Sequence, residues 1–390
     1  MDDNDPVLPK ELLHDITDTV AEDDHAIPTL PAITQTSHAM RLRAQKDIYE
    51  TIEVDIADND YINELGHIHA TDPMVLAEYP RTLILCKSQN LDRDLADTPI
   101  LKTIISQMRN LQVVSFRTLN VVGWPFTDSF ASPSMAQITN LELKHITLTF
   151  HAFNSFISCP CLTELFLARL NVVEYKSVKE GTDFSAPDCS LPQLQSALRC
   201  PLKELCLDIV TASNFVIMDL TTTSRYPIIA EDSLIKVNFS SNYSEDNQVH
   251  LFQRFFNYKA IKSAKTLHLG DHQKSFTDSD STGYDPLRFN VFETVELCVF
   301  TGQDWFLYQP EFQWWANSLS VVRASSLLKK LRLIITFCEI DVRTLLDMTM
   351  NMWDDLDRAL CGDNMKLEHL AIDIATPVAL DRQAKSVVKR

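Results

Sequence analysis

The sequence predicts an α/β protein in which short strands and helices alternate along the chain and stack beside one another. Three observations support this fold class. A short apolar frame, in which two leucine-like residues stand two positions apart, returns many times. Segments with apolar residues at helical spacing lie between several of these frames. The beginning of the chain has the pattern of one further amphipathic helix, which precedes the repeats.

The N-terminal helix is expected over residues 7–20, with the sequence VLPKELLHDITDTV. Its apolar residues fall on one stripe of a helix: Leu8, Leu12, Leu13, Ile16 and Val20. Such a stripe either caps the first repeat or docks on another protein. Both are compatible if some of its residues face the repeat and others face the partner. Residues 1–30 carry nine acidic and one basic residue. This segment is either a solvated end or one that steers toward a basic partner.

The apolar frame is clearest at residues 162–171, LTELFLARLN. The intervals between successive frames run from 24 to 40 residues with a mean of 32. Two apolar residues two apart lie on one face of a strand. A strand that recurs at this distance predicts a solenoid, because each unit buries its apolar face only against its neighbours. The frames begin at residues 111, 138, 162, 202, 234, 264, 292, 328 and 367, with weaker copies at 49–54 and 80–85.

Helices are predicted in four of the connecting segments, at residues 99–108, 150–157, 249–256 and 342–361. Each has apolar residues that recur at three- and four-residue spacing. Pro99 suits the first turn of its helix, where the missing N–H has no partner to lose.

This pattern resembles an irregular leucine-rich-repeat array over roughly residues 80–376. The frame LIKVNFSSN fits the family in full, with Leu234, Val237, Phe239 and Asn242. In that family the asparagine satisfies backbone groups in the turn after the strand. Two other frames have their asparagine one position later, at Asn120 and Asn171. A different α/β fold whose buried strands read L-x-L remains the alternative.

Residues 7–54 resemble an F-box, the helical module that binds the Skp-type adaptor of cullin–RING ubiquitin ligases. The family opens with Leu-Pro-x-Glu and apolar residues at helical spacing, matched here from Leu8 onward. A second helix is matched by LPAITQTSHAM, and the exit into the first strand by IYETIEV. An F-box followed by such an array is typical of fungal proteins of this size. The resemblance implies adaptor binding through Leu8, Pro9, Leu12, Leu13, Ile16, Leu30, Ile33 and Met40.

The chain is therefore divided into an acidic tail (1–6), an F-box-like helical segment (7–54), a leucine-rich-repeat-like array (55–376) and a basic C-terminal tail (377–390). The resemblance implies an adaptor that recruits a protein target to a Skp–cullin–F-box ligase and catalyses nothing itself. The first alternative is a binding scaffold without a ligase role. A remote alternative is an enzyme on an α/β fold.

Composition restricts the partners and cofactors. The net charge of −18 disfavours nucleic acid, which is bound through Lys and Arg. We expect no membrane span, since no apolar run approaches ~18 residues. The acidic start and the nine scattered cysteines favour a cytoplasmic or nuclear protein.

Only seven glycines are present, and none forms a phosphate-binding loop or nucleophile elbow. Cys159 and Cys161 are too close in sequence for a zinc pair, so no metal or other cofactor is expected.

Six aromatic residues lie within residues 305–315, WFLYQPEFQWW. Aromatic residues at this density belong either to the core or to a contact patch, because Trp and Tyr dominate binding hot spots. The candidate target contacts are therefore Trp305, Tyr308, Trp314 and Trp315.

Overall fold

The computed structural model describes residues 10–21, 32–33, 38–88, 95, 98–122, 137–157, 159–172, 200–208, 230, 233–240, 256, 261–270, 286–301, 309–322, 326–337, 353–362 and 365–375. The chain divides into two compact units. The first unit comprises residues 1–162 and 170–180, and the second comprises residues 163–169 and 181–390.

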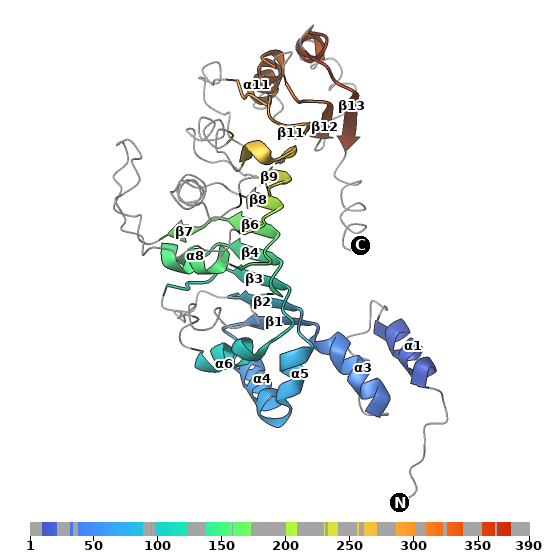
Figure 1. The fold of residues 1–390 in the computed structure, drawn as a ribbon, viewed down its shortest axis with the longest axis vertical. Coiled ribbons are helices and arrows are strands. Elements are labelled where there is room, and N and C mark those ends of the chain that lie inside the picture. Colours follow the sequence, from blue (N-terminus) through green and yellow to red (C-terminus); the bar gives the residue numbers. More distant parts are fainter. Residues whose placement is uncertain are drawn as a thin grey trace, which may run out of the picture. The chain divides into compact units, whose positions relative to one another are not determined.

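The first unit contains four parallel strands that lie side by side in chain order (Figure 1). Helices α4, α5 and α6 gather beside the first of these strands. Each strand aligns with the next without a shift, so Ile52 pairs with Leu83, and Leu83 with Val114. The strands are β1 (Thr51–Asp55), β2 (Thr82–Cys86), β3 (Val113–Arg117) and β4 (Asn140–Lys144).

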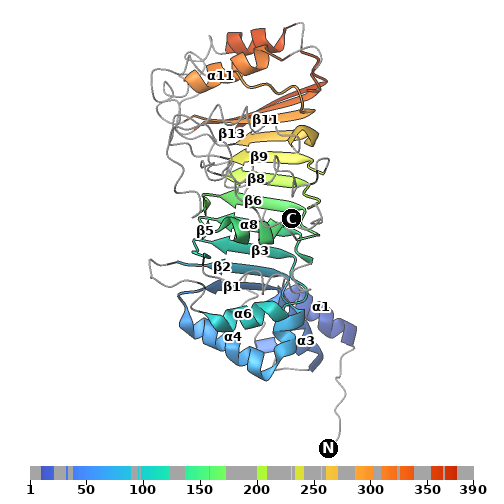
Figure 2. The ribbon, with the colours of Figure 1, turned by 60° about the vertical axis from the view of Figure 1, so that its left-hand side comes forward.

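The second unit contains seven parallel strands, and Figure 2 shows β6, β8 and β9 side by side in chain order. Each begins two residues after the start of a predicted frame, as do β3 and β4. The predicted α/β fold class is therefore confirmed. The strands are β6 (Glu164–Ala168), β8 (Glu204–Asp208), β9 (Lys236–Ser240), β10 (Thr266–Gly270), β11 (Thr294–Thr301), β12 (Lys330–Phe337) and β13 (His369–Ala375).

The two apolar residues of most frames point into the core, whereas Leu370 and Ile372 on the last strand, β13, are 42% and 43% exposed. In β10, Leu267 and Leu269 are fully buried, while His268 between them is only half-buried. Large aromatic rings fill the space beside these rows. Phe256 makes edge-to-face contacts with Phe239 and Phe292, at ring-centroid distances of 6.1 and 5.3 Å. Period-2 alternation thus gives most strands one buried and one polar side.

Paired backbone hydrogen bonds fix the register at the strand starts. The carbonyl of Lys265 accepts from the N–H groups of both Glu293 and Thr294, at 2.9 and 3.0 Å. The carbonyl of Glu293 in turn accepts from Lys329 and Lys330 at the same distances. Successive strands therefore begin level with one another.

The helices include α1 (Lys10–Ala21), α3 (His38–Tyr49), α4 (Asn59–Thr71), α5 (Pro73–Glu78), α6 (Pro99–Gln107), α8 (Phe150–Ile157) and α11 (Gln309–Ser320). A 3-10 turn, η4 (Ile261–Ser263), precedes β10, and residues 353–360 are helical. The predicted helices at 99–108 and 150–157 are confirmed as α6 and α8. Most of the helix predicted at 249–256 lies outside the described residues, and the one at 342–361 is described from residue 353. Every helix in the described ranges is too short or too polar to cross a membrane.

A second, shorter ladder follows the strands of the first unit. Strand β5 (Thr147–Leu148) pairs in parallel with β7 (Asn171–Val172), and Asn120 forms a bridge to Thr147. The Asn171 side chain donates to Thr147 Oγ1 at 3.3 Å, and Asn120 Oδ1 accepts from the N–H of Val122 at 3.2 Å. Asn120 and Asn171 thus both satisfy groups in this second ladder.

Candidate interaction surfaces

Helices α1 and α3 form a packed pair in the first unit. The Arg43 guanidinium makes two bonds to the Asp18 carboxylate, at 2.5 and 2.8 Å. Beside this ion pair, Ile33 and Ala44 form a small core that Val20 and Met40 help to cover. The Arg43 bond holds the pKa of Asp18 below its usual value. The α1 helix is therefore anchored to α3 by both charge and apolar contact.

The apolar stripe predicted on this helix divides between two directions. Leu13 is only 6% exposed, whereas Leu12 and Ile16 are 44% and 40% exposed. Ile33 is buried and Met40 is half-buried within the pair. Three further residues predicted to bind the adaptor, Leu8, Pro9 and Leu30, lie outside the described residues. Within the described part of the stripe, Leu12 and Ile16 are the exposed residues.

The polar side of the sheet in the first unit carries one dense charge cluster. The Glu142 carboxylate on β4 accepts hydrogen bonds from Ser115, Arg117 and Lys144. Burial raises the pKa of Glu142, but the bonds from Lys144, Ser115 and Arg117 outweigh it and leave the pKa below its usual value. The charged side chains of this cluster therefore neutralise one another through hydrogen bonds and ion pairs.

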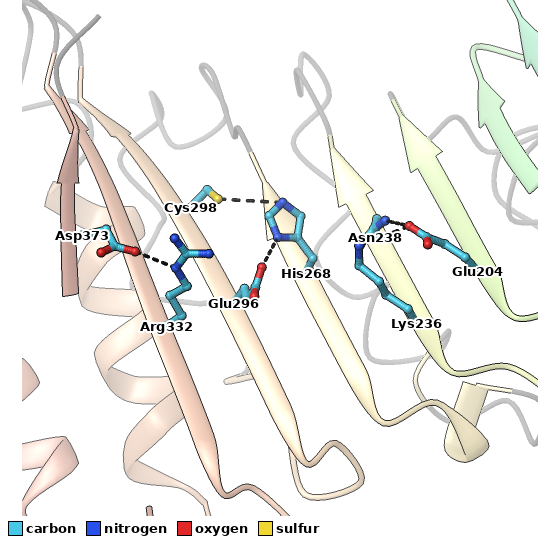
Figure 3. Close-up of polar contacts among 8 residues, drawn as sticks. All are labelled: Glu204, Lys236, Asn238, His268, Glu296, Cys298, Arg332 and Asp373. Carbon is cyan, nitrogen blue, oxygen red and sulfur yellow. Dashed lines mark hydrogen bonds and ion pairs between the residues drawn. The ribbon is translucent and has the colours of Figure 1, made fainter. Parts of the chain in front are cut away.

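The polar side in the second unit, hereafter the polar face, is longer and more varied (Figure 3). Glu204 accepts from Asn238 at 2.6 Å and pairs with Lys236 at 3.2 Å. Arg332 on β12 pairs with Asp373 on β13 at 2.6 Å, and this pair raises the pKa of Arg332. The polar face comprises Glu204, Lys236, Asn238, His268, Glu296, Cys298, Arg332 and Asp373.

The middle of the polar face brings together three residues that the sequence had not linked. His268 Nδ1 lies 3.0 Å from Glu296 Oε2, and His268 Nε2 lies 3.8 Å from Cys298 Sγ. The parallel register places His268 directly opposite Glu296. This group combines a base, its carboxylate partner and a thiol on two neighbouring strands.

Two of the aromatic residues predicted to contact a target are buried in the structure. Trp314 and Trp315 on α11 are 4% and 3% exposed, and their ring centroids are 4.4 Å apart. Trp315 also stacks on Phe289, with centroids 6.3 Å apart. These two tryptophans therefore belong to the core of the second unit, because α11 turns them inward. Trp305 and Tyr308 lie outside the described residues.

No group of three or more His, Cys, Asp or Glu side chains within the described ranges is arranged to hold a metal ion. Cys159 is buried and burial raises its pKa to about 11, while Cys161 two residues later is exposed. These two thiols occupy different environments.

No model of a known protein family matches the chain, and no curated protein matches it.

Proposed function

We propose that this protein is a protein–protein interaction adaptor that binds a Skp-type ligase subunit through α1 and holds a protein target on its parallel sheet. The chain serves as the substrate-recruiting part of a cullin–RING ubiquitin ligase. The supporting observation is the division of the α1 stripe, in which Leu13 packs inward while Leu12 and Ile16 stay exposed.

An exposed apolar pair on an anchored helix fits helix-in-groove recognition. Leu12 and Ile16 are four residues apart, so they lie one above the other on the same face of α1. The ion pair between Asp18 and Arg43 and the small core around Ala44 hold α1 on α3. A pre-formed helix loses less conformational freedom on binding than a disordered one does.

The target side of the proposal rests on the sheet. We interpret the parallel strands as the strand layer of an irregular leucine-rich-repeat-like solenoid. Sequential parallel pairing, a level register and inward L-x-L rows within each unit support this interpretation. The polar face then offers alternating acidic and basic side chains, which suits a polar protein surface of mixed charge.

Co-expression with a Skp-type adaptor, followed by size-exclusion chromatography, tests the ligase link. We expect the wild-type chain to co-elute with the adaptor. The double variant Leu12→Asp/Ile16→Asp should not co-elute, because burying an unpaired aspartate in the interface costs several kcal/mol. Thr19→Asp is the matched control, since Thr19 is exposed on the same helix but polar. It should co-elute normally.

A scaffold without a ligase role is the second candidate. Its support is that Leu13, Ile33 and Ala44 are already buried within the helical pair, as in a cap. A wild-type chain that fails to co-elute would exclude the ligase function. If the double variant also lost its circular dichroism signal, α1 would be identified as a cap that the fold requires.

A further inference from the structure

The three residues at the middle of the polar face form an ordered line across two strands (Figure 3). Glu296 on β11 contacts His268 on β10, and the far nitrogen of the same ring faces Cys298, two residues beyond Glu296. Residues two apart on a strand lie on the same side, so Glu296 and Cys298 both meet the ring of His268.

The Glu296 carboxylate determines which ring nitrogen carries the proton. An ionised carboxylate only accepts hydrogen bonds, so His268 Nδ1 must donate across the 3.0 Å contact. In the neutral ring, Nε2 then holds the lone pair, and it faces Cys298 Sγ at 3.8 Å. The imidazole is therefore oriented to take the thiol proton.

Gly270 makes room for this orientation. A Cβ at position 270 would lie 2.9 Å from His268 Nε2 and 3.4 Å from His268 Cδ2, which is too close for the ring to stay where it is. The ring thus leans along β10 over the Cα of Gly270 toward Cys298. The chain has only seven glycines, and one of them is the residue over which the His268 ring lies.

Arg332 adds positive charge to this site from the next strand. It pairs with Asp373 on β13 and lies near enough to Glu296 and Cys298 to interact with both electrostatically. On the other side, β9 contributes the neutral Asn238, whose neighbour Lys236 is paired with Glu204. A thiolate at Cys298 would thus face the imidazolium of His268 and interact electrostatically with the Arg332 guanidinium.

The thiol is within reach of small molecules. The side chains of His268 and Glu296 are 28% and 27% exposed, and Cys298 is half-buried. Over Thr294–Leu297 the backbone of β11 is paired with both β10 and β12, so the N–H groups beside Glu296 are engaged in the sheet and do not form an oxyanion hole. This geometry favours reactions at sulfur, which need only a thiolate and a leaving group.

We propose that Cys298 is a reactive thiol, activated by His268 and Glu296, that forms mixed disulfides with small disulfides such as glutathione disulfide. His268 Nε2 accepts the thiol proton, and the Cys298 thiolate attacks one sulfur of the disulfide. A new S–S bond forms to Cys298 as the old S–S bond breaks. The departing thiolate takes the proton from His268 and leaves as a thiol. This modification is independent of the proposed ligase role.

The other described thiols provide the internal comparison. Cys361 is exposed but donates to Asp357 at 3.5 Å, and that bond raises its pKa. Cys86 is half-buried, and burial raises its pKa, as do the nearby Asp55 and Glu53. Exposure alone therefore predicts that an exposed thiol, Cys361 or Cys161, reacts first, whereas the proposal predicts that Cys298 does.

Peptide mapping of the full-length reduced protein after brief exposure to glutathione disulfide tests the proposal. At pH 7 we expect mixed disulfide at Cys298 to form at least threefold faster than at Cys361, because a thiolate paired with a cation gains more in population than it loses in nucleophilicity. The rate at Cys298 should reach half its maximum below pH ~8.5, the value for an ordinary thiol. Equal rates, or a half-maximum at or above that pH, would overturn it.

Two variants test the positioning residues without touching the thiol. His268→Gln and Gly270→Ala should each slow modification of Cys298 at pH 7 by about threefold or more and move the half-maximal pH upward. Cys361→Ser should leave both quantities unchanged. An unchanged pH profile in folded His268→Gln would contradict the proposal. If that variant failed to fold by circular dichroism, the wild-type profile and Glu296→Gln, expected to shift it upward, would decide.

Discussion

Three residues directly after strands adopt a left-handed backbone without being glycine. Thr118 follows β3, His145 follows β4 and Arg169 follows β6, with φ of 59°, 54° and 47°. This conformation costs roughly 1–2 kcal/mol for a residue with a Cβ, and most for a β-branched one such as threonine. Its repetition after three strands shows that the exit turn requires it. The chain accepts this strain at positions where glycine would fit.

Replacing Thr118 with glycine should therefore stabilise the protein. We expect Thr118→Gly to raise the free energy of unfolding by about 0.5–1 kcal/mol. The backbone strain that glycine relieves at this positive φ is larger than the stability lost because glycine makes the unfolded chain more flexible. Urea denaturation followed by circular dichroism measures the change. Thr139→Gly, at a threonine whose φ is not positive, should instead destabilise. A loss of stability in Thr118→Gly would show that its side chain is needed there.

At the scale of elements, α8 shows how a connecting helix is held on the strands. Its Phe153, Phe156 and Ile157 are fully buried, and the ring of Phe156 meets that of Phe116 on β3 edge-to-face with centroids 5.1 Å apart. Edge-to-face aromatic pairs contribute about 0.5–1.5 kcal/mol beyond the burial of their area. The attachment of α8 thus combines the burial of three apolar side chains with this aromatic contact.

Truncation of that ring should be costly. Phe156→Ala is expected to lower the free energy of unfolding by about 3–5 kcal/mol, because it removes a buried ring and leaves a cavity. Chemical denaturation monitored by fluorescence gives the value. Val122→Ala removes apolar atoms from an exposed side chain and should cost under ~1 kcal/mol. Similar losses in both variants would mean that Phe156 does not anchor α8.

The strands could be predicted because their signal is local. Two apolar residues two apart and a polar residue between them give both the strand and its buried side. Alignment of the frames that begin at 264 and 292 even places His268 opposite Glu296, as the structure does. The lean of the His268 ring over Gly270 toward Cys298 could not be read in this way. It depends on side-chain rotamers and on space that only packing defines.

Helices with few apolar positions escaped prediction. In α4, Ile62 and Leu65 are the buried residues of a 13-residue helix, so its periodicity is weak. Its start depends instead on a cap, in which the Asp58 side chain accepts from the N–H of Tyr61 at 3.0 Å. For α11, the six aromatic residues in the sequence did not indicate which side chains face the core. Only the structure of the helix shows that Trp314 and Trp315 face inward.

At the scale of the whole molecule, the acidic balance governs its behaviour in solution. The net charge of −18 makes copies of the chain repel one another at pH 7, and the isoelectric point from the sequence is about 5.0. We expect a solubility minimum near pH 5, because repulsion between molecules vanishes as the carboxylates become protonated. Turbidity measured from pH 4 to 8 tests this. A minimum well away from pH 5 would indicate association driven by something other than charge.

The level register of the strands has a consequence for how this protein can change through evolution. One residue inserted within a strand would exchange its inward and outward side chains and destroy the core there. Residues added between strands cost little, since doubling a loop adds only about 0.6 kcal/mol. The frames of β3 and β4 begin 27 residues apart and those of β6 and β8 begin 40 residues apart, yet both pairs of strands are aligned level. Insertions and deletions should therefore accumulate in the connections, where new binding specificities can arise without refolding the sheet.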